Sequence, residues 1–73
     1  MATLDEITYI WDKAVIWTNR AKKLRILADD KNYDLLQQTR FLALATIHLK
    51  RARECLLTAN KLIDENLNAL FKN

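Results

Sequence analysis

The side chains best suited to chemistry are the single histidine and the single cysteine, His48 and Cys55, seven residues apart. On a helix this spacing puts them on one side, but about 10 Å apart along the axis at a rise of 1.5 Å per residue. A thiol nucleophile and its activating base need hydrogen-bond contact, so the pair does not form a catalytic dyad. We therefore expect Cys55 to pack as a small apolar residue and His48 to lie at the edge of a helix interface.

The sequence also lacks the residues that a metal site or a phosphate-binding loop would need. One cysteine and one histidine do not complete a four-ligand zinc site, and no Glu-x-x-His pair is present for a di-iron centre. There is no glycine for a glycine-rich phosphate loop. The sequence thus predicts a protein that is not an enzyme, with no catalytic residue, metal site, cofactor or small-molecule substrate. Capping of helices accounts for most of the acids, namely Asp5, Glu6, Asp29, Asp30 and Asp34.

Two basic clusters remain, NRAKKLR at 19–25 and KRAR at 50–53. In an antiparallel helix pair we expect the first cluster to lie opposite residues 38–43, two or three turns from the second. The formal charge of +3 permits nucleic acid as a partner without requiring it, and we favour a solvated surface. The candidate contacts for nucleic-acid phosphates are Arg20, Lys23, Lys50 and Arg51.

The composition indicates a small all-α chain with little room for a core. The 73 residues include neither glycine nor proline, which make tight turns and break helices. Hydrophobic residues make up 51% of the chain, whereas a domain of this size buries only about 60% of its unfolded surface. The longest apolar run, FLALA at 41–45, is far shorter than the roughly 20 residues of a membrane span. We expect a cytoplasmic protein, outside membranes, that gains stability by association.

The chain divides into two predicted helices joined by one polar segment. Thr3 and Glu6 have the spacing of a capping box, which predicts a first helix over about 4–28. The segment ADDKNYD at 28–34 supplies a loop at about 29–32, after which Asp30 or Asn32 is expected to cap a second helix over about 33–71. A break near 58–60 would instead give a third helix and a three-helix monomer. No glycine or proline marks that break, so we favour a continuous second helix.

Both helices carry an apolar heptad seam typical of coiled coils, and folding at the loop sets the two seams antiparallel. Aligned outward from the loop, nearly every predicted layer pairs a small side chain with a large one, as in Trp17 with Ala45 and Ala14 with Leu49. This pattern predicts a closely packed helical hairpin. The predicted seam comprises Ile7, Ile10, Ala14, Trp17, Ala21, Leu24, Leu35, Leu42, Ala45, Leu49, Ala52 and Leu56.

The predicted hairpin leaves much apolar surface uncovered. The second helix is expected to extend beyond its partner after Ala59, and its apolar arc spans roughly 200°, where one buried stripe needs little over 100°. A homodimer of hairpins, forming a four-helix bundle, would cover much of this surface. The residues predicted to meet a second chain or another partner are Trp11, Ile16, Phe41, Leu44, Cys55, Leu62, Ile63, Leu67, Leu70 and Phe71.

These features favour a non-catalytic protein–protein interaction module, a self-associating hairpin that serves as a small regulator or assembly adaptor and docks on another protein. In hairpin layout, loop position and alternating layers the chain also resembles the Rop-type plasmid RNA-binding regulators, although the extension after Ala59 departs from that layout. This resemblance implies the alternative function, a nucleic-acid-binding regulator. A third option is a structural subunit that polymerises through the protruding end of the second helix.

Overall fold

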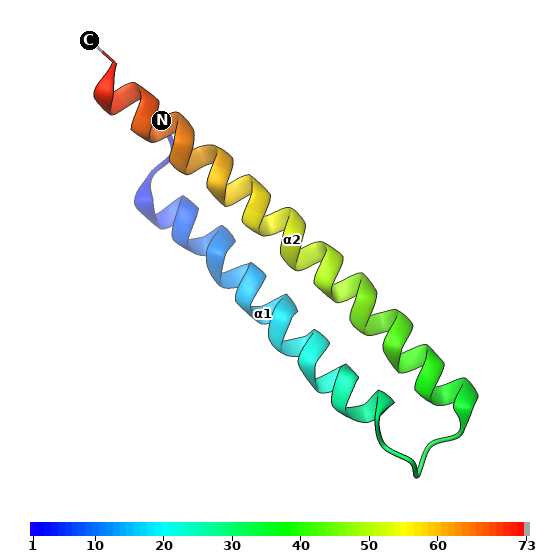
Figure 1. Ribbon diagram of the computed structural model, residues 1–73. Coiled ribbons are helices and arrows are strands. Elements are labelled where there is room, and N and C mark those ends of the chain that lie inside the picture. Colours follow the sequence, from blue (N-terminus) through cyan, green and yellow to red (C-terminus); the bar gives the residue numbers. More distant parts are fainter. Residues whose placement is uncertain (73) are drawn as a thin grey trace.

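The computed structural model describes residues 1–72 and contains two antiparallel α-helices, α1 (Leu4–Ala28) and α2 (Leu35–Phe71) (Figure 1). No strand occurs in these residues, so the expected all-α hairpin is confirmed. The Cα atoms fill a flat rod of 60 × 15 × 11 Å, and α2 extends past the start of α1 at the end that holds both termini (Figure 1). Neither helix, over residues 1–72, has an apolar stretch long enough to cross a membrane.

Local interactions account for the start of α1. Thr3 is the N-cap, and its Oγ1 accepts a hydrogen bond of 3.1 Å from the backbone N–H of Glu6. Asp5 and Glu6 place negative charge in the first turn, where the helix dipole favours it. The helix therefore begins where the capping pattern of the sequence predicts.

The start of α2 differs from the expectation. The helix begins at Leu35 rather than near residue 33, and its N-cap is Asp34 rather than Asp30 or Asn32. The Asp34 carboxylate accepts a 2.8 Å hydrogen bond from the backbone N–H of Gln37. Asp30 is engaged in the turn instead, where its carboxylate accepts a 2.9 Å hydrogen bond from the N–H of Asn32. The turn is therefore longer than predicted, because the Asp30 carboxylate stabilises the turn instead of capping the helix.

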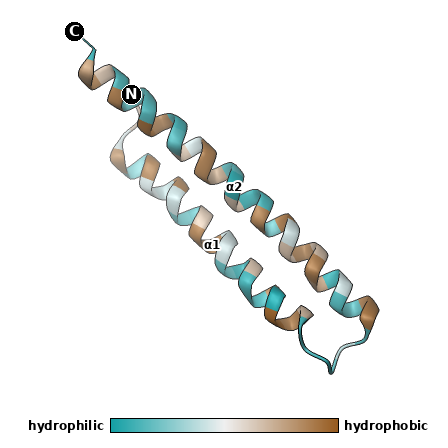
Figure 2. Cartoon of the chain, in the orientation of Figure 1, coloured by the Kyte–Doolittle hydropathy of each residue, from teal (hydrophilic) through white to brown (hydrophobic). Residues whose placement is uncertain are grey.

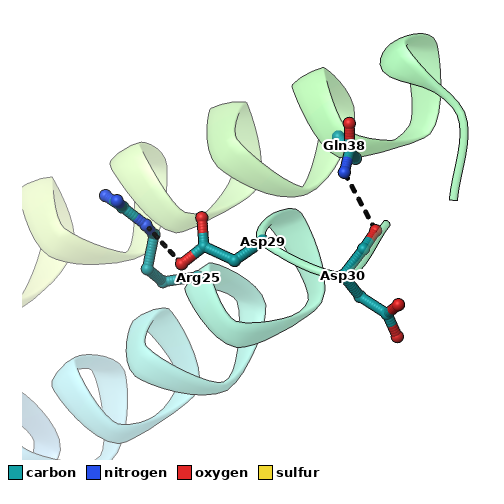
Figure 3. Close-up of polar contacts among 4 residues, drawn as sticks. All are labelled: Arg25, Asp29, Asp30 and Gln38. Atoms are coloured by element: carbon teal, nitrogen blue, oxygen red, sulfur yellow. Dashed lines mark hydrogen bonds and ion pairs between the residues drawn. The ribbon is translucent and has the colours of Figure 1, made fainter. Parts of the chain in front are cut away.

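Two side-chain amides fix the register of the hairpin, one at each end. At the turn, Nε2 of Gln38 donates a 2.9 Å hydrogen bond to the carbonyl oxygen of Asp30 (Figure 3). At the far end, Asn66 donates to the Ala2 carbonyl oxygen at 2.8 Å and accepts from the Ala2 N–H at 3.1 Å. Ala2 to Asp30 and Gln38 to Asn66 both span 28 residues, so the two helices advance in step between these tethers.

The helix interface is built from small side chains of both helices. Buried residues recur at every seventh position, and all but one of them are alanines. Alanine lets two helix backbones approach closely, so the larger side chains are displaced to either side of the buried row. The buried residues are Ile7, Ala14 and Ala21 of α1 and Ala45, Ala52 and Ala59 of α2.

The predicted layers of one small and one large side chain are wrong. Equal steps from the two tethers bring Ala14 level with residue 54, within two residues of the buried Ala52, whereas the pairing predicted from the sequence sets Ala14 against Leu49. Trp17, expected opposite Ala45, packs its ring on His48, with ring centroids 5.0 Å apart. The register is therefore about one helical turn away from the prediction, and small residues face small ones.

Contacts within the chain also continue further along α2 than expected. Ala59, where the partner helix was predicted to end, is only 1% exposed, and Ile63 beyond it is half-buried. Asn66 is held by its hydrogen bonds to Ala2. α2 shows no interruption at 58–60, so the third-helix alternative is not seen. The free end of α2 begins only at Leu67.

We expect Asn66→Ala to loosen the end of the hairpin where the termini meet. The substitution removes both hydrogen bonds to Ala2, each worth about 0.5–1.5 kcal/mol net, so the free energy of unfolding should fall by about 1–2 kcal/mol. Urea denaturation measures this loss. The control is Asn60→Ala, at an exposed asparagine of the same helix, which should change stability by less than about 0.5 kcal/mol. Equal losses in both variants would contradict the tether.

Candidate interaction surfaces

The flat hairpin presents two broad faces, one on each side of the buried row of small residues. Residues seven apart on a helix share a face, and neighbouring side chains of the two helices line common grooves. We call one side the leucine face, formed by Leu4, Trp11, Val15 and Thr18 of α1 and Leu35, Leu42, Leu49 and Leu56 of α2. The other is the tryptophan face, formed by Ile10, Trp17 and Leu24 of α1 and Phe41, His48, Cys55 and Leu62 of α2.

The leucine face is an uncovered apolar trough. Three large side chains along its middle are about half exposed, with values of 47% for Trp11, 45% for Leu42 and 51% for Leu49. Successive hollows along the face are lined by the buried alanines Ala14 and Ala21 and by these large residues, together with the charged side chains of Lys22 and Arg25. Apolar residues occur along the whole length of both helices (Figure 2). The trough is therefore long enough to receive another helix pair.

The tryptophan face is covered by its own side chains. Trp17 is half-buried, and its ring contacts the His48 ring, with the two planes tilted by 55°. Phe41 makes an edge-on contact with Tyr33 of the turn, with ring centroids 4.9 Å apart. Nδ1 of His48 lies 2.7 Å from the carbonyl oxygen of Leu44, at hydrogen-bond distance. These contacts leave less apolar surface open here than on the leucine face.

The expected separation of the two basic clusters is wrong for one residue of each, Arg20 and Arg51. The guanidinium carbon of Arg20, from α1, lies 5.0 Å from the centre of the Trp17 ring, and that of Arg51, from α2, lies 4.9 Å from it. The register shift of about one turn explains this, because it carries the second cluster toward the first. Lys23 lies exposed one turn beyond Arg20, whereas Lys50 lines a separate groove with residues of α2 alone.

The residues predicted to meet a partner do not gather in one patch. Sequence reasoning also missed the centre of the leucine face, because it assigned Leu42 and Leu49 to the interior of the hairpin, where they are about half exposed. Of the predicted partner residues, Trp11 lies on the leucine face, and Ile16 is exposed on α1. Phe41, Cys55 and Leu62 are half-buried on the tryptophan face, with Leu44 at its border, and Ile63 is half-buried further along α2. Leu67, Leu70 and Phe71 are exposed at the free end of α2.

The polar side chains of the hairpin are arranged for binding at a surface. Over residues 1–72 no three His, Cys, Asp or Glu side chains converge as a metal site would require. His48 is turned toward Trp17, and the free thiol of Cys55 lies in the groove that Trp17 and Arg51 also line. The arrangement therefore presents an apolar trough on one face and paired guanidinium groups on the other.

Comparison with protein families, with curated proteins and with solved structures finds no match for this chain. The resemblance to Rop-type regulators rested in part on alternating small and large layers, which the structure replaces with small residues that face small residues. The hairpin layout is what remains of that resemblance. The function is therefore argued from the two faces of the hairpin.

Proposed function

We propose that this chain is a non-catalytic interaction module whose hairpins self-associate through their leucine faces into a four-helix bundle. The observation that carries the proposal is that the interior of the hairpin buries few large side chains. Five of its six buried residues are alanines, and over residues 1–72 no large side chain is fully buried. A chain that is 51% hydrophobic needs a second surface to bury its large side chains.

The exposed area supports association on a scale typical of stable dimers. The hairpin exposes 6024 Å², whereas a compact monomer of 8.6 kDa exposes about 4,700 Å². The excess of about 1,300 Å² is larger than the roughly 800 Å² that each partner buries in a standard interface. The radius of gyration, 17.0 Å, similarly exceeds the value of about 11 Å for a compact chain of this length.

The leucine face suits self-association better than the tryptophan face does. Completing the burial of Trp11, Leu42 and Leu49, each about half exposed, contributes about 1 kcal/mol per side chain. Cations also line the leucine face, but Arg25 there is paired with Asp29 and the long stem of Lys22 lets its ammonium reach water. A contact through the tryptophan face would instead remove Arg20 and Arg51 from water, and burial of an unpaired charge is costly. A two-fold dimer through the leucine face therefore keeps both guanidinium groups in solvent.

In this dimer, the free end of α2 is the part left to contact another protein. Leu67, Leu70 and Phe71 are 44%, 66% and 80% exposed, beyond the last contacts with the N-terminus. An adaptor or regulator would use this end to dock on its target, and polymerisation through it is the competing outcome. A reducing cytoplasmic setting suits such a module, because Cys55 then remains a thiol.

Light scattering across a concentration series tests the proposal. We expect a constant mass of two chains from low to high protein concentration, unaffected by salt, because the contact is apolar. A monomer that keeps its full helical content at every concentration would overturn the dimer. A mass that grows with concentration would overturn the closed dimer in favour of a polymer joined through the free end of α2.

A further inference from the structure

Two cations lie against Trp17 on the tryptophan face, and a third, Lys13, lines the same groove with its ammonium 4.9 Å from the centre of the Tyr9 ring. The guanidinium carbons of Arg20 and Arg51 lie 5.0 Å and 4.9 Å from the centre of one ring, and therefore at most about 10 Å from each other. Lys13 lines the same groove of about 410 Å³ as Trp17 and Arg51. We propose that this group, which we call the cation cluster, binds the phosphate backbone of a nucleic acid.

The cation cluster is not neutralised by its own chain. In residues 1–72 the one ion pair within 4.0 Å joins Arg25 to Asp29, so neither Arg20 nor Arg51 is paired with a carboxylate there. Glu54 is the one acid among the residues that line the groove. Three positive charges against one negative charge leave a local excess that attracts anions.

The aromatic ring prepares the guanidinium groups for phosphate. A planar guanidinium stacked on an indole is held in place, while its N–H donors stay free to bind an anion with two parallel hydrogen bonds. The ring of Trp17 is half-buried and already contacts Arg20, Arg51 and His48, so little of it is left for a base to stack on. The contact is therefore with phosphates, and we expect it to be independent of base sequence.

A polyanion with regular charge spacing fits better than a single carboxylate. Lys13 and Arg20 are seven residues apart and share one side of α1, and Lys23 continues the row one turn further. Such a row can follow the repeating charges of a nucleic-acid strand. The inference stands on the hairpin alone. In the proposed dimer, both copies would carry the cation cluster on an outward face, which gives two sites per dimer.

Fluorescence anisotropy with a fluorescein-labelled DNA duplex and its separate single strand tests this site. We expect both probes to bind, with affinity that falls as salt rises. Arg20→Gln and Arg51→Gln should each weaken binding about eightfold at 0.1 M salt and lower the salt slope by about one, because each removes one phosphate contact. Arg51→Lys should keep the slope, because it keeps the charge. The matched control is Arg40→Gln, at an exposed arginine of α2, which should change neither quantity.

Several results would overturn the inference. They are the absence of salt-dependent binding by the natural sequence, or losses in Arg20→Gln and Arg51→Gln no larger than in Arg40→Gln. Displacement of the probe by polyglutamate at equal charge would also overturn it, in favour of an acidic protein partner. If a glutamine variant loses helical content, Lys13→Gln tests the same groove, with the same expected loss. A monomer that binds nucleic acid through these residues would support this site while overturning the proposed dimer.

Discussion

Leu49→Glu is expected to dissociate the proposed dimer and to lower the helical content of the separated chains. Leu49 lies near the middle of the leucine face, and its side chain is 51% exposed in the hairpin. An unpaired charge at this place in an apolar interface costs about 3–5 kcal/mol, which raises the dissociation constant by a factor of about 10³. Sedimentation equilibrium measures the mass, and circular dichroism at the same concentrations measures the helix.

Ile47→Glu is the matched control for this substitution. Ile47 belongs to the same helix and is 49% exposed, but two residues of helix turn it by about 200° away from Leu49. A charge there points away from the leucine face, so we expect a dimer of unchanged mass. If both variants dissociate, the loss of any exposed apolar side chain weakens the dimer, and the leucine face is not specifically the interface. A stable dimer in Leu49→Glu would place the interface elsewhere.

The start of α1 and the two-helix architecture can be predicted from the sequence because they depend on local chemistry. The Thr3 cap and the absence of glycine and proline predict two helices without knowledge of any tertiary contact. The cap of α2 was harder to predict, because Asp30, Asn32 and Asp34 all have side chains that can cap a helix. The structure engages Asp30 in the turn and leaves the cap to Asp34.

The register could not be read from apolar periodicity. The heptad pattern is satisfied either by small residues opposite large ones or by small opposite small, since the two differ by about one turn. Polar contacts accompany the observed choice, with Gln38 bonded to Asp30 and Asn66 bonded to Ala2. Both amides stand at the ends of the alanine row of α2. A prediction from the spacing of apolar residues takes no account of such polar residues.

The shift in register also explains why the exposed leucines and the meeting of the two arginines were not predicted from the sequence. An interior built from large leucines would hide Leu42 and Leu49 and would keep Arg20 apart from Arg51. With alanines in the interior, the leucines are displaced onto one face and the two arginines meet over Trp17 on the other. One turn of slippage thus decides which residues are available to partners.

The largest effect on stability is expected at the alanine row itself. Ala52 is 3% exposed and lies within two residues of the level of Ala14, which is 1% exposed, so Ala52→Leu forces the two helices apart. Overpacking at a site with no free space should lower the free energy of unfolding by about 3 kcal/mol. In a chain of this size that loss lowers the thermal midpoint by more than about 10 °C. Thermal unfolding at fixed protein concentration measures the loss. The control, Ala43→Leu at an exposed alanine of α2, should leave the midpoint nearly unchanged.

A double-mutant cycle then tests the register directly. If Ala14 and Ala52 face each other, Ala14→Leu alone should cost as much as Ala52→Leu alone, and the double variant should cost less than their sum. The reason is that the first leucine already separates the helices, so the second fills part of the space that opens between them. Residues in contact show coupling of about 0.5–3 kcal/mol in such cycles. Strictly additive losses would place the two alanines in different layers, as the register predicted from sequence does.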